Sequence, residues 1–309
     1  MRYYAYYPGC SMEATGAPVE KAIQAIAKPL DIELMELEDW TCCGSSPFSG
    51  VDKVKAMAIT ARVLAQAEKT GLDLVTPCSS CYTILHEANE LMRDDHKLAW
   101  QVHEALTSVG LNYNGTVKVR HIVEVIYNDV GLEALAARVK RPLTGLKVAC
   151  YHGCQQVRPE YGYDDREYPD WLDQISRALG AEPVNYPLKA KCCGSSLVIS
   201  ETGMALELIH KLLANAADNG AQAIVSTTCP LCHTALDAYQ SAVNGKYKTR
   251  FNLPVLAVPQ IIAVALGLDF KQAALDGNIV SPRRLLDPYF KSKIAATGVT
   301  APAQKAAAG

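Results

Sequence analysis

Three cysteine-bearing motifs occur twice along the 309-residue chain, in the same order. The repeated pairs are YPGC at 7–10 with YHGC at 151–154, CCGSS at 42–46 with CCGSS at 192–196, and TPCSSC at 76–81 with TTCPLC at 227–232. The offsets between the copies lie between 144 and 151 residues, so chance similarity of unrelated loops does not explain them. The chain is therefore two copies of one unit.

Each copy alternates segments typical of strands with segments typical of amphipathic helices. In the first copy, strands are predicted at 2–7, 32–38 and 72–77, and helices at 19–30 and 51–69. The second copy repeats this order, which predicts an α/β fold with parallel sheets flanked by helices. In such sheets, sites form in the loops at the carboxyl ends of strands. Because every cysteine motif follows a predicted strand, we expect the motifs to converge in space.

The boundary between the copies is predicted in the segment KRPLTG at 140–145, where proline and glycine interrupt the pattern before a new strand. We expect an N-terminal domain at 1–143 and a C-terminal domain at 144–281. The segment 282–309 ends in a stretch without aromatic residues or a periodic apolar face. It is predicted to be a poorly ordered tail.

The cysteine content indicates a reducing compartment. The sequence holds 11 cysteines, starts without the apolar segment of a signal peptide, and contains no apolar run of about 18 residues or more. We therefore expect a cytoplasmic protein without a membrane span, whose thiols serve in metal binding or redox catalysis rather than in disulfides. The formal net charge of −2, without a lysine and arginine cluster, argues against a nucleic-acid partner.

Ten of the cysteines form two sets of five with nearly the same spacing. Neighbouring Cα atoms lie about 3.8 Å apart, short of the roughly 4.4 to 6.8 Å of a relaxed disulfide, so the adjacent pairs are poor disulfide partners. Thiolates select zinc, copper(I) or iron–sulfur clusters, and structural zinc sites close at four ligands. A fifth cysteine per set favours a polynuclear cluster. Gly44 and Gly194 would let the backbone turn tightly and approach inorganic sulfide.

Three further residues near the motifs have weaker signals. Cys150 stands in a predicted strand without a counterpart in the first copy, and is interpreted as a core residue. His152 and His233 each lie beside a motif cysteine and are weak catalytic candidates. Neither has a histidine counterpart in the first copy, so a supporting hydrogen bond is the favoured role for both.

The duplicated pattern, with a spacing of 31 or 37 residues before Cys-Cys-Gly and 33 or 34 before Cys-x2-Cys, resembles the cysteine-rich CCG domains of the B-type subunit of heterodisulfide reductase. The stretches YYPGCSMEATG and LEDWTCCG are similar to bacterial members, including those of sulfur metabolism. The resemblance implies two duplicated CCG domains, related by a pseudo-two-fold axis, each holding a noncubane [4Fe-4S] cluster. The implied ligands are Cys10, Cys42, Cys43, Cys78 and Cys81 for one cluster, and Cys154, Cys192, Cys193, Cys229 and Cys232 for the other.

The function that this resemblance implies is that of an iron–sulfur oxidoreductase subunit. It would reduce or form a disulfide or persulfide bond of small thiols or of a carrier-bound sulfur. Because the chain has no ferredoxin-like CxxCxxC run, electrons would come from or go to a partner, an electron-transferring iron–sulfur subunit and, as a further candidate, a flavin subunit. Two alternatives stay open: a subunit that only relays electrons, and a CCG protein with structural zinc in one site.

Overall fold

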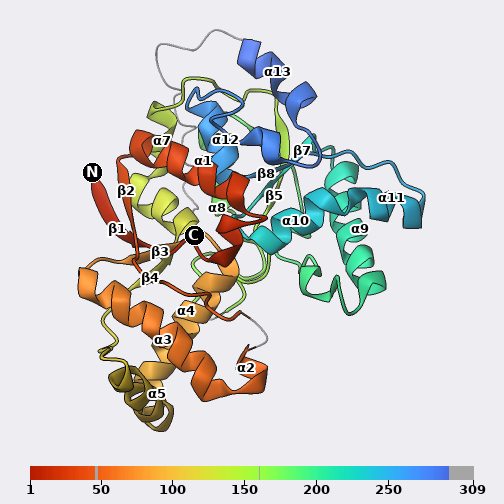
Figure 1. Cartoon of the computed structure of the whole chain (residues 1–309). Helices are drawn as coiled ribbons and strands as arrows, with labels where there is room; N and C mark the ends of the chain where they lie inside the picture. Colours follow the sequence, from red (N-terminus) through yellow and green to blue (C-terminus); the bar gives the residue numbers. More distant parts are fainter. Residues whose placement is uncertain (46–47, 160, 292–309) are drawn as a thin grey trace, which may run out of the picture.

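A computed structural model describes residues 1–45, 48–159 and 161–291 (Figure 1). Each copy of the repeat forms one four-stranded parallel sheet flanked by helices, so the predicted α/β fold is confirmed. The first sheet contains β1 (Arg2–Tyr6), β2 (Ile32–Glu36), β3 (Leu74–Thr76) and β4 (Val119–His121). The second sheet contains β5 (Lys147–Tyr151), β6 (Glu182–Pro183), β7 (Ala223–Ser226) and β8 (Val255–Ala257).

The two sheets have the same topology. Their strand orders are β2-β1-β3-β4 and β6-β5-β7-β8, with every neighbouring pair parallel. The central strands β3 and β7 are buried along their whole length, as expected for strands covered on both faces. Since parallel neighbours need crossover connections, each copy also contains the helices that make them.

The helices of the first half begin with α1 (Ala17–Ala27) and include α2 (Phe48–Val51), α3 (Lys53–Thr70), α4 (Ser79–Asp94), α5 (His96–Ser108), α6 (Ile122–Glu124), the π-helix η3 (Val125–Val130) and α7 (Leu132–Ala137), with short 3₁₀ turns η1 (Cys10–Glu13) and η2 (Lys28–Leu30). The long helix α3 starts where the Asp52 carboxylate accepts a hydrogen bond from the Lys55 backbone N–H, 3.1 Å away. It ends at Gly71, whose φ of 68° is the left-handed conformation of a helix C-terminus.

The second half contains α8 (Trp171–Ala178), α9 (Thr202–Asp218), α10 (Pro230–Ala238), α11 (Gln240–Tyr247), α12 (Val258–Ala265) and α13 (Arg283–Lys291), with 3₁₀ turns η4 (Ser195–Leu197) and η5 (Leu275–Gly277). Within the described ranges, no helix is long and apolar enough to cross a bilayer. The strands of the two sheets lie on either side of residue 143. The domain boundaries themselves stay predictions.

One hydrophobic core extends across both halves, and a second, smaller apolar cluster surrounds Cys193, Cys229 and Cys232. Helix α12 of the second half packs against α1 of the first half, and the two lie side by side in Figure 1. Buried residues from both halves, such as Ile23 and Ile261, belong to the same apolar cluster. The Arg141 guanidinium donates hydrogen bonds to the carbonyl oxygens of Val264 and Leu268, at 3.0 and 2.9 Å. The halves are therefore packed together along an extensive contact.

Residues 283–291, which the sequence assigns to the poorly ordered tail, form helix α13 instead. Leu286 is completely buried, and the Tyr289 hydroxyl donates a hydrogen bond to the Thr144 carbonyl at 3.1 Å. The Phe290 ring lies under the Arg141 guanidinium, 4.7 Å from its centroid. The short helix was missed because its few apolar residues surround Pro288 and show no long periodic face. The rest of the predicted tail, 292–309, lies outside the described residues.

Candidate functional site

All the cysteine motifs lie at the carboxyl ends of strands. In the first half, Cys10 opens η1 after β1, the adjacent cysteines follow β2, and Cys78 precedes α4 after β3. In the second half, Cys154 follows β5, the adjacent pair follows β6, and Cys229 precedes α10 after β7. Because parallel strands end at the same sheet edge, each half gathers its five cysteines there, as the spacing predicts.

The first set contains two close sulfur pairs. The Sγ atoms of Cys10 and Cys42 lie 3.4 Å apart, as do those of Cys43 and Cys81. Cys10 and Cys42 are exposed, whereas Cys43, Cys81 and Cys78 are buried. The set therefore has a solvent-facing side and a side embedded in the core.

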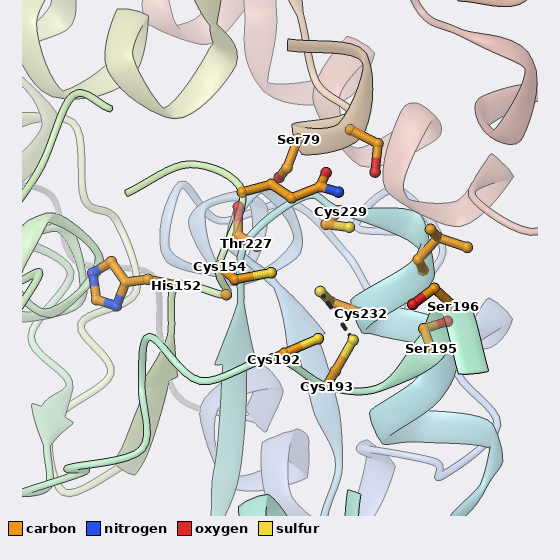
Figure 2. Close-up of a pocket in the computed structure, with 14 residues that line it drawn as sticks. Ser79, His152, Cys154, Cys192, Cys193, Ser195, Ser196, Thr227, Cys229 and Cys232 are labelled. Carbon is orange, nitrogen blue, oxygen red and sulfur yellow. Dashed lines mark hydrogen bonds between the residues drawn. The ribbon is translucent and has the colours of Figure 1, made fainter. Parts of the chain in front are cut away.

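The second set surrounds a cavity of about 50 Å³. Figure 2 shows the five sulfur atoms directed toward one another across this cavity. The Sγ atoms of Cys193 and Cys232 lie 3.4 Å apart, and Cys192 is exposed while Cys229 is buried. Like the first set, the second set combines an accessible thiol with embedded ones.

The loops of the two sets meet between the halves. The Thr228 hydroxyl, next to Cys229, donates a hydrogen bond to the carbonyl oxygen of Pro77, next to Cys78. The Gln156 side-chain amide donates to the Ser79 hydroxyl at 2.8 Å. The cavity of the second set is lined by Ser79 and its neighbour Ser80 from the first half. Each set therefore lies against the interface.

A buried tyrosine holds each pair of adjacent cysteines. The Tyr7 hydroxyl donates a hydrogen bond to the Thr41 carbonyl at 2.8 Å, and the Tyr151 hydroxyl donates to the Lys191 carbonyl at 2.7 Å. Thr41 and Lys191 each come directly before a Cys-Cys pair. The two tyrosines open the repeated YPGC and YHGC motifs. Their repetition could have indicated a role at the site, although sequence reasoning did not single them out.

Glycines of the cysteine motifs permit tight turns and close packing. Gly44 and Gly194 have φ values of 76° and 74°, which confirms the tight turn after each cysteine pair. A Cβ at Gly194 would meet Leu208 of α9 at 2.9 Å, so this glycine also permits close helix packing. A Cβ at Gly9 would lie 2.9 Å from the Cys81 Sγ, and one at Gly153 would lie 3.6 Å from another cysteine sulfur.

Contacts between thiols give the cysteines of each set different pKa values. The contact with Cys81 lowers the pKa of Cys43 to about 7. In the second set, the contact with Cys154 lowers the pKa of Cys192 to about 2, and the contact with Cys192 raises the pKa of Cys193 to about 12. Thiols that ionise readily thus lie beside thiols that keep their protons. Metal binding to such a set would release the remaining protons.

The pKa of Cys229 is lowered by groups from both halves. The largest cause is its contact with Cys232, which outweighs the effect of burial. Backbone N–H groups of its own loop and the Ser80 hydroxyl of the first half also contribute. Among the described residues, no group of three or more histidine, cysteine, aspartate or glutamate side chains is arranged to hold a single metal ion.

The two histidine candidates do not face the sulfur atoms. The His152 ring points away from the cysteines in Figure 2, and its Nε2 accepts a hydrogen bond from the Leu172 backbone N–H at 3.2 Å. His233 is buried with its Nδ1 3.3 Å from the Ser226 hydroxyl. Burial lowers the pKa of His233 to about 4. Their geometry favours a supporting role in the loops over a catalytic one.

Cys150 lies apart from the sulfur sets. It is completely buried in β5, and its Sγ lies 3.4 Å from the Ser176 hydroxyl of α8. Burial raises its pKa well above the ordinary range. The contacts agree with its interpretation as a core residue.

Comparisons with known proteins place these sites in context. A family model described as a cysteine-rich domain, CCG, matches residues 4–86 and 148–237. The chain is 35% identical over 288 residues to a protein of Archaeoglobus profundus that is named as similar to the B-type subunit of heterodisulfide reductase, covering 91% of this chain and 95% of the relative. It is 34% identical over 284 residues to the 8-methylmenaquinol:fumarate reductase membrane anchor subunit of Wolinella succinogenes, covering 91% and 98%.

Among solved structures, a hypothetical protein from Helicobacter pylori has the same fold, with a TM-score of 0.73 and 16% identity. The similarity covers 90% of this chain and 52% of that protein, so this chain spans about half of its length. At this level of identity the comparison concerns the fold alone.

Proposed function

Because the chain belongs to the family of B-type heterodisulfide reductase subunits with duplicated cysteine-rich CCG domains, we propose that it is a reductase subunit acting on sulfur. The reaction is the reduction or formation of a disulfide or persulfide bond of small thiols or of a carrier-bound sulfur. Two noncubane [4Fe-4S] clusters serve as cofactors. Their proposed ligands are the two sets of five cysteines described above.

The donor chemistry of the site supports this proposal. Each half brings five free thiols to one sheet edge, with sulfur pairs 3.4 Å apart in both sets. Gly9 leaves space beside the Cys81 sulfur that a side chain would fill. Soft, closely spaced thiolates are the ligands that iron–sulfur clusters require. The observation that carries the proposal is this duplicated set on two sheets whose cysteine loops meet.

The chemistry requires two electrons for each disulfide. Breaking one S–S bond with two electrons yields two thiolates, and the reverse reaction releases two electrons. Bound clusters would each supply a one-electron redox centre, so two sets would provide the two electrons that one disulfide requires. The chain's own residues hold the thiols: Tyr7 and Tyr151 support the loops before the adjacent pairs, and three cysteines of each set are buried. The exposed Cys10, Cys42 and Cys192 mark the side from which a substrate enters.

Electrons would be exchanged with an electron-transferring iron–sulfur subunit and, in some assemblies, with a flavin subunit. A cytoplasmic setting agrees with 11 cysteines that form no disulfide in the described residues. The name of the Wolinella succinogenes relative describes a subunit of a quinol:fumarate reductase. Because that name places the relative in an enzyme whose named substrates are a quinol and fumarate rather than a thiol, electron relay within a larger complex is the second candidate function.

The experiment that separates the two candidates is electron paramagnetic resonance spectroscopy of anaerobically purified protein. A small thiol such as dithiothreitol, cysteine or coenzyme A is added to the oxidised protein. A chain that acts on sulfur should show a changed cluster spectrum, because the thiol reaches the cluster environment. An unchanged spectrum with every thiol tested, in protein that contains iron, would support the relay function instead.

A further inference from the structure

The two Cys-x2-Cys loops differ at the residues between their cysteines. The first loop has Ser79 and Ser80 in this position, and the second has Pro230 and Leu231. The two motifs occupy equivalent places, because Cys78 and Cys229 precede α4 and α10 and the residues that follow them form the first turns of these helices. One half therefore has a polar pair at the position where the other half has an apolar pair. The duplicated sites are not equivalent.

Ser80 is buried and directed toward the site of the other half. Its side chain is 5% exposed, and it lines the cavity around the second set of cysteines. Within the described part of the chain, its hydroxyl has no hydrogen-bond partner of good geometry. The Cys229 thiol of the second half lines the same cavity. A buried hydroxyl without a partner is unfavourable, which indicates an acceptor at this place in the functional protein.

We propose that the Ser80 hydroxyl of the first half donates a hydrogen bond to the Cys229 sulfur and thereby raises the reduction potential of the group bound in the second set. This inference rests on the proposed function, because it requires a redox group in that set. Ser80 is a positioning and tuning residue that acts through Cys229. Its hydrogen bond makes the group bound in the second set easier to reduce than the group bound in the first set.

The physical reason is that a reduced cluster carries more negative charge on its sulfur atoms than an oxidised one. A hydrogen bond to a ligand sulfur stabilises the reduced state more, and so raises the potential. The effect is strengthened in a buried site of low dielectric constant. Leu231, which takes the place of Ser80 in the second half, has no hydroxyl. A difference in potential between two neighbouring centres would direct the first electron to the second set.

The test compares three variants of the anaerobically reconstituted chain: Ser80→Ala, Ser80→Thr and Thr83→Val. Thr83→Val is the matched control, because the Thr83 hydroxyl also bonds across the halves, to the Gln155 carbonyl at 3.1 Å. The readout is the midpoint potential of each set, from a redox titration followed by electron paramagnetic resonance. A Cys43→Ala variant, which disables the first set, identifies the signal of the second.

Ser80→Ala should lower the potential of the second set alone. At a fixed solution potential, the ratio of reduced to oxidised second set should fall about fivefold, which corresponds to the loss of one hydrogen bond. Ser80→Thr, which keeps the hydroxyl, should retain the wild-type potential, and Thr83→Val should leave both potentials unchanged.

Four results would overturn the inference. An unchanged potential in Ser80→Ala with full iron content would show that the hydroxyl does not act on the second set. Loss of iron from that set, or an equal shift in Thr83→Val, would show a structural role for the interface instead. Absence of iron from the wild-type chain after reconstitution would overturn the proposed function itself, and this inference with it.

Discussion

Two tyrosines from equivalent strands support the adjacent cysteines of the two sets. Tyr7 and Tyr151 are buried beneath the sulfur atoms, and each donates a hydrogen bond to the carbonyl that precedes a cysteine pair. Burial raises the pKa of Tyr7 and Tyr151 well above the ordinary range, and the neighbouring cysteines add to this shift. The hydroxyls therefore remain protonated donors at any physiological pH.

Replacing Tyr151 by phenylalanine should weaken the second set without unfolding the chain. The loss of one buried hydrogen bond costs about 1 kcal/mol and frees the loop before Cys192. Iron should then leave the second set faster when a chelator is added, as followed by visible absorbance. Tyr186→Phe is the control, since the buried Tyr186 hydroxyl donates instead to the Leu212 carbonyl of α9, at 3.2 Å. Equal rates of iron loss in the two variants would contradict the role of Tyr151.

The two sets should bind iron independently, because each half has a complete set of five on its own loops. Replacing Cys193 by alanine should lower the iron content by about half and leave the first set occupied. Iron analysis together with the remaining paramagnetic signal measures both effects. Equal loss from the two sets would show that the halves share one cluster.

Cys150 should not contribute to iron binding. Its replacement by serine should keep the full iron content and cost about 1 to 2 kcal/mol of unfolding free energy, because the side chain is completely buried in β5. Iron analysis and urea unfolding of the same preparation measure the two quantities. Iron loss as large as that of a Cys154→Ala variant would refute the assignment of Cys150 to the core.

At the scale of elements, the connection between the halves is a set of polar contacts beneath the cysteine loops. His121, at the end of β4, donates a hydrogen bond from Nε2 to the Pro77 carbonyl at 2.8 Å and accepts one at Nδ1 from the Val123 backbone N–H at 3.2 Å. Thr228 of the second half bonds to the same carbonyl. The strand ends of both sheets are thus joined through Pro77.

This arrangement predicts a loss of stability in mild acid. Burial lowers the pKa of His121 to about 3, below the ordinary value near 6.5. Between these two pH values, the histidine is protonated in the unfolded chain and neutral in the folded chain. Above pH 6.5 the free energy of unfolding does not depend on the protonation of this histidine. As the pH falls from 6.5 toward 3, the unfolded chain takes up the proton and the free energy of unfolding decreases. Each such histidine contributes up to about 1.4 kcal/mol per pH unit, and buried His152 and His233 act in the same direction.

Urea unfolding between pH 7.5 and pH 5 measures this dependence. A His121→Gln variant should be less stable at pH 7.5 but should lose stability less steeply below pH 6.5. A slope equal to that of the wild-type chain would show that His121 does not remain neutral in the fold.

The elements that the sequence could predict are those whose pattern is local. The strands β1, β3 and β7 and the long helices α3 and α9 follow from apolar periodicity and turn residues, and the cysteines follow from spacing. The contribution of Ser80 could not be predicted, because it depends on how the two halves face each other. Helix α13 depends on contacts with residue 144 and Arg141, which are remote in sequence.

On the scale of the whole molecule, the shared core keeps the two cysteine sets at one interface. The packing of α1 against α12 and the merged apolar cluster join the halves away from the loops. Two separate domains on a flexible linker would not hold two redox sites in a constant relation. The shared core therefore supports one reaction at both sets, and the predicted pseudo-two-fold relation would give each set an equivalent approach to the substrate.

The most direct test of this account is the iron and acid-labile sulfide content of the anaerobically purified chain. Two [4Fe-4S] clusters predict about eight iron and about eight sulfide per chain. Zinc in place of iron, or about four iron with none lost in a Cys193→Ala variant, would contradict the proposal that each half holds its own cluster.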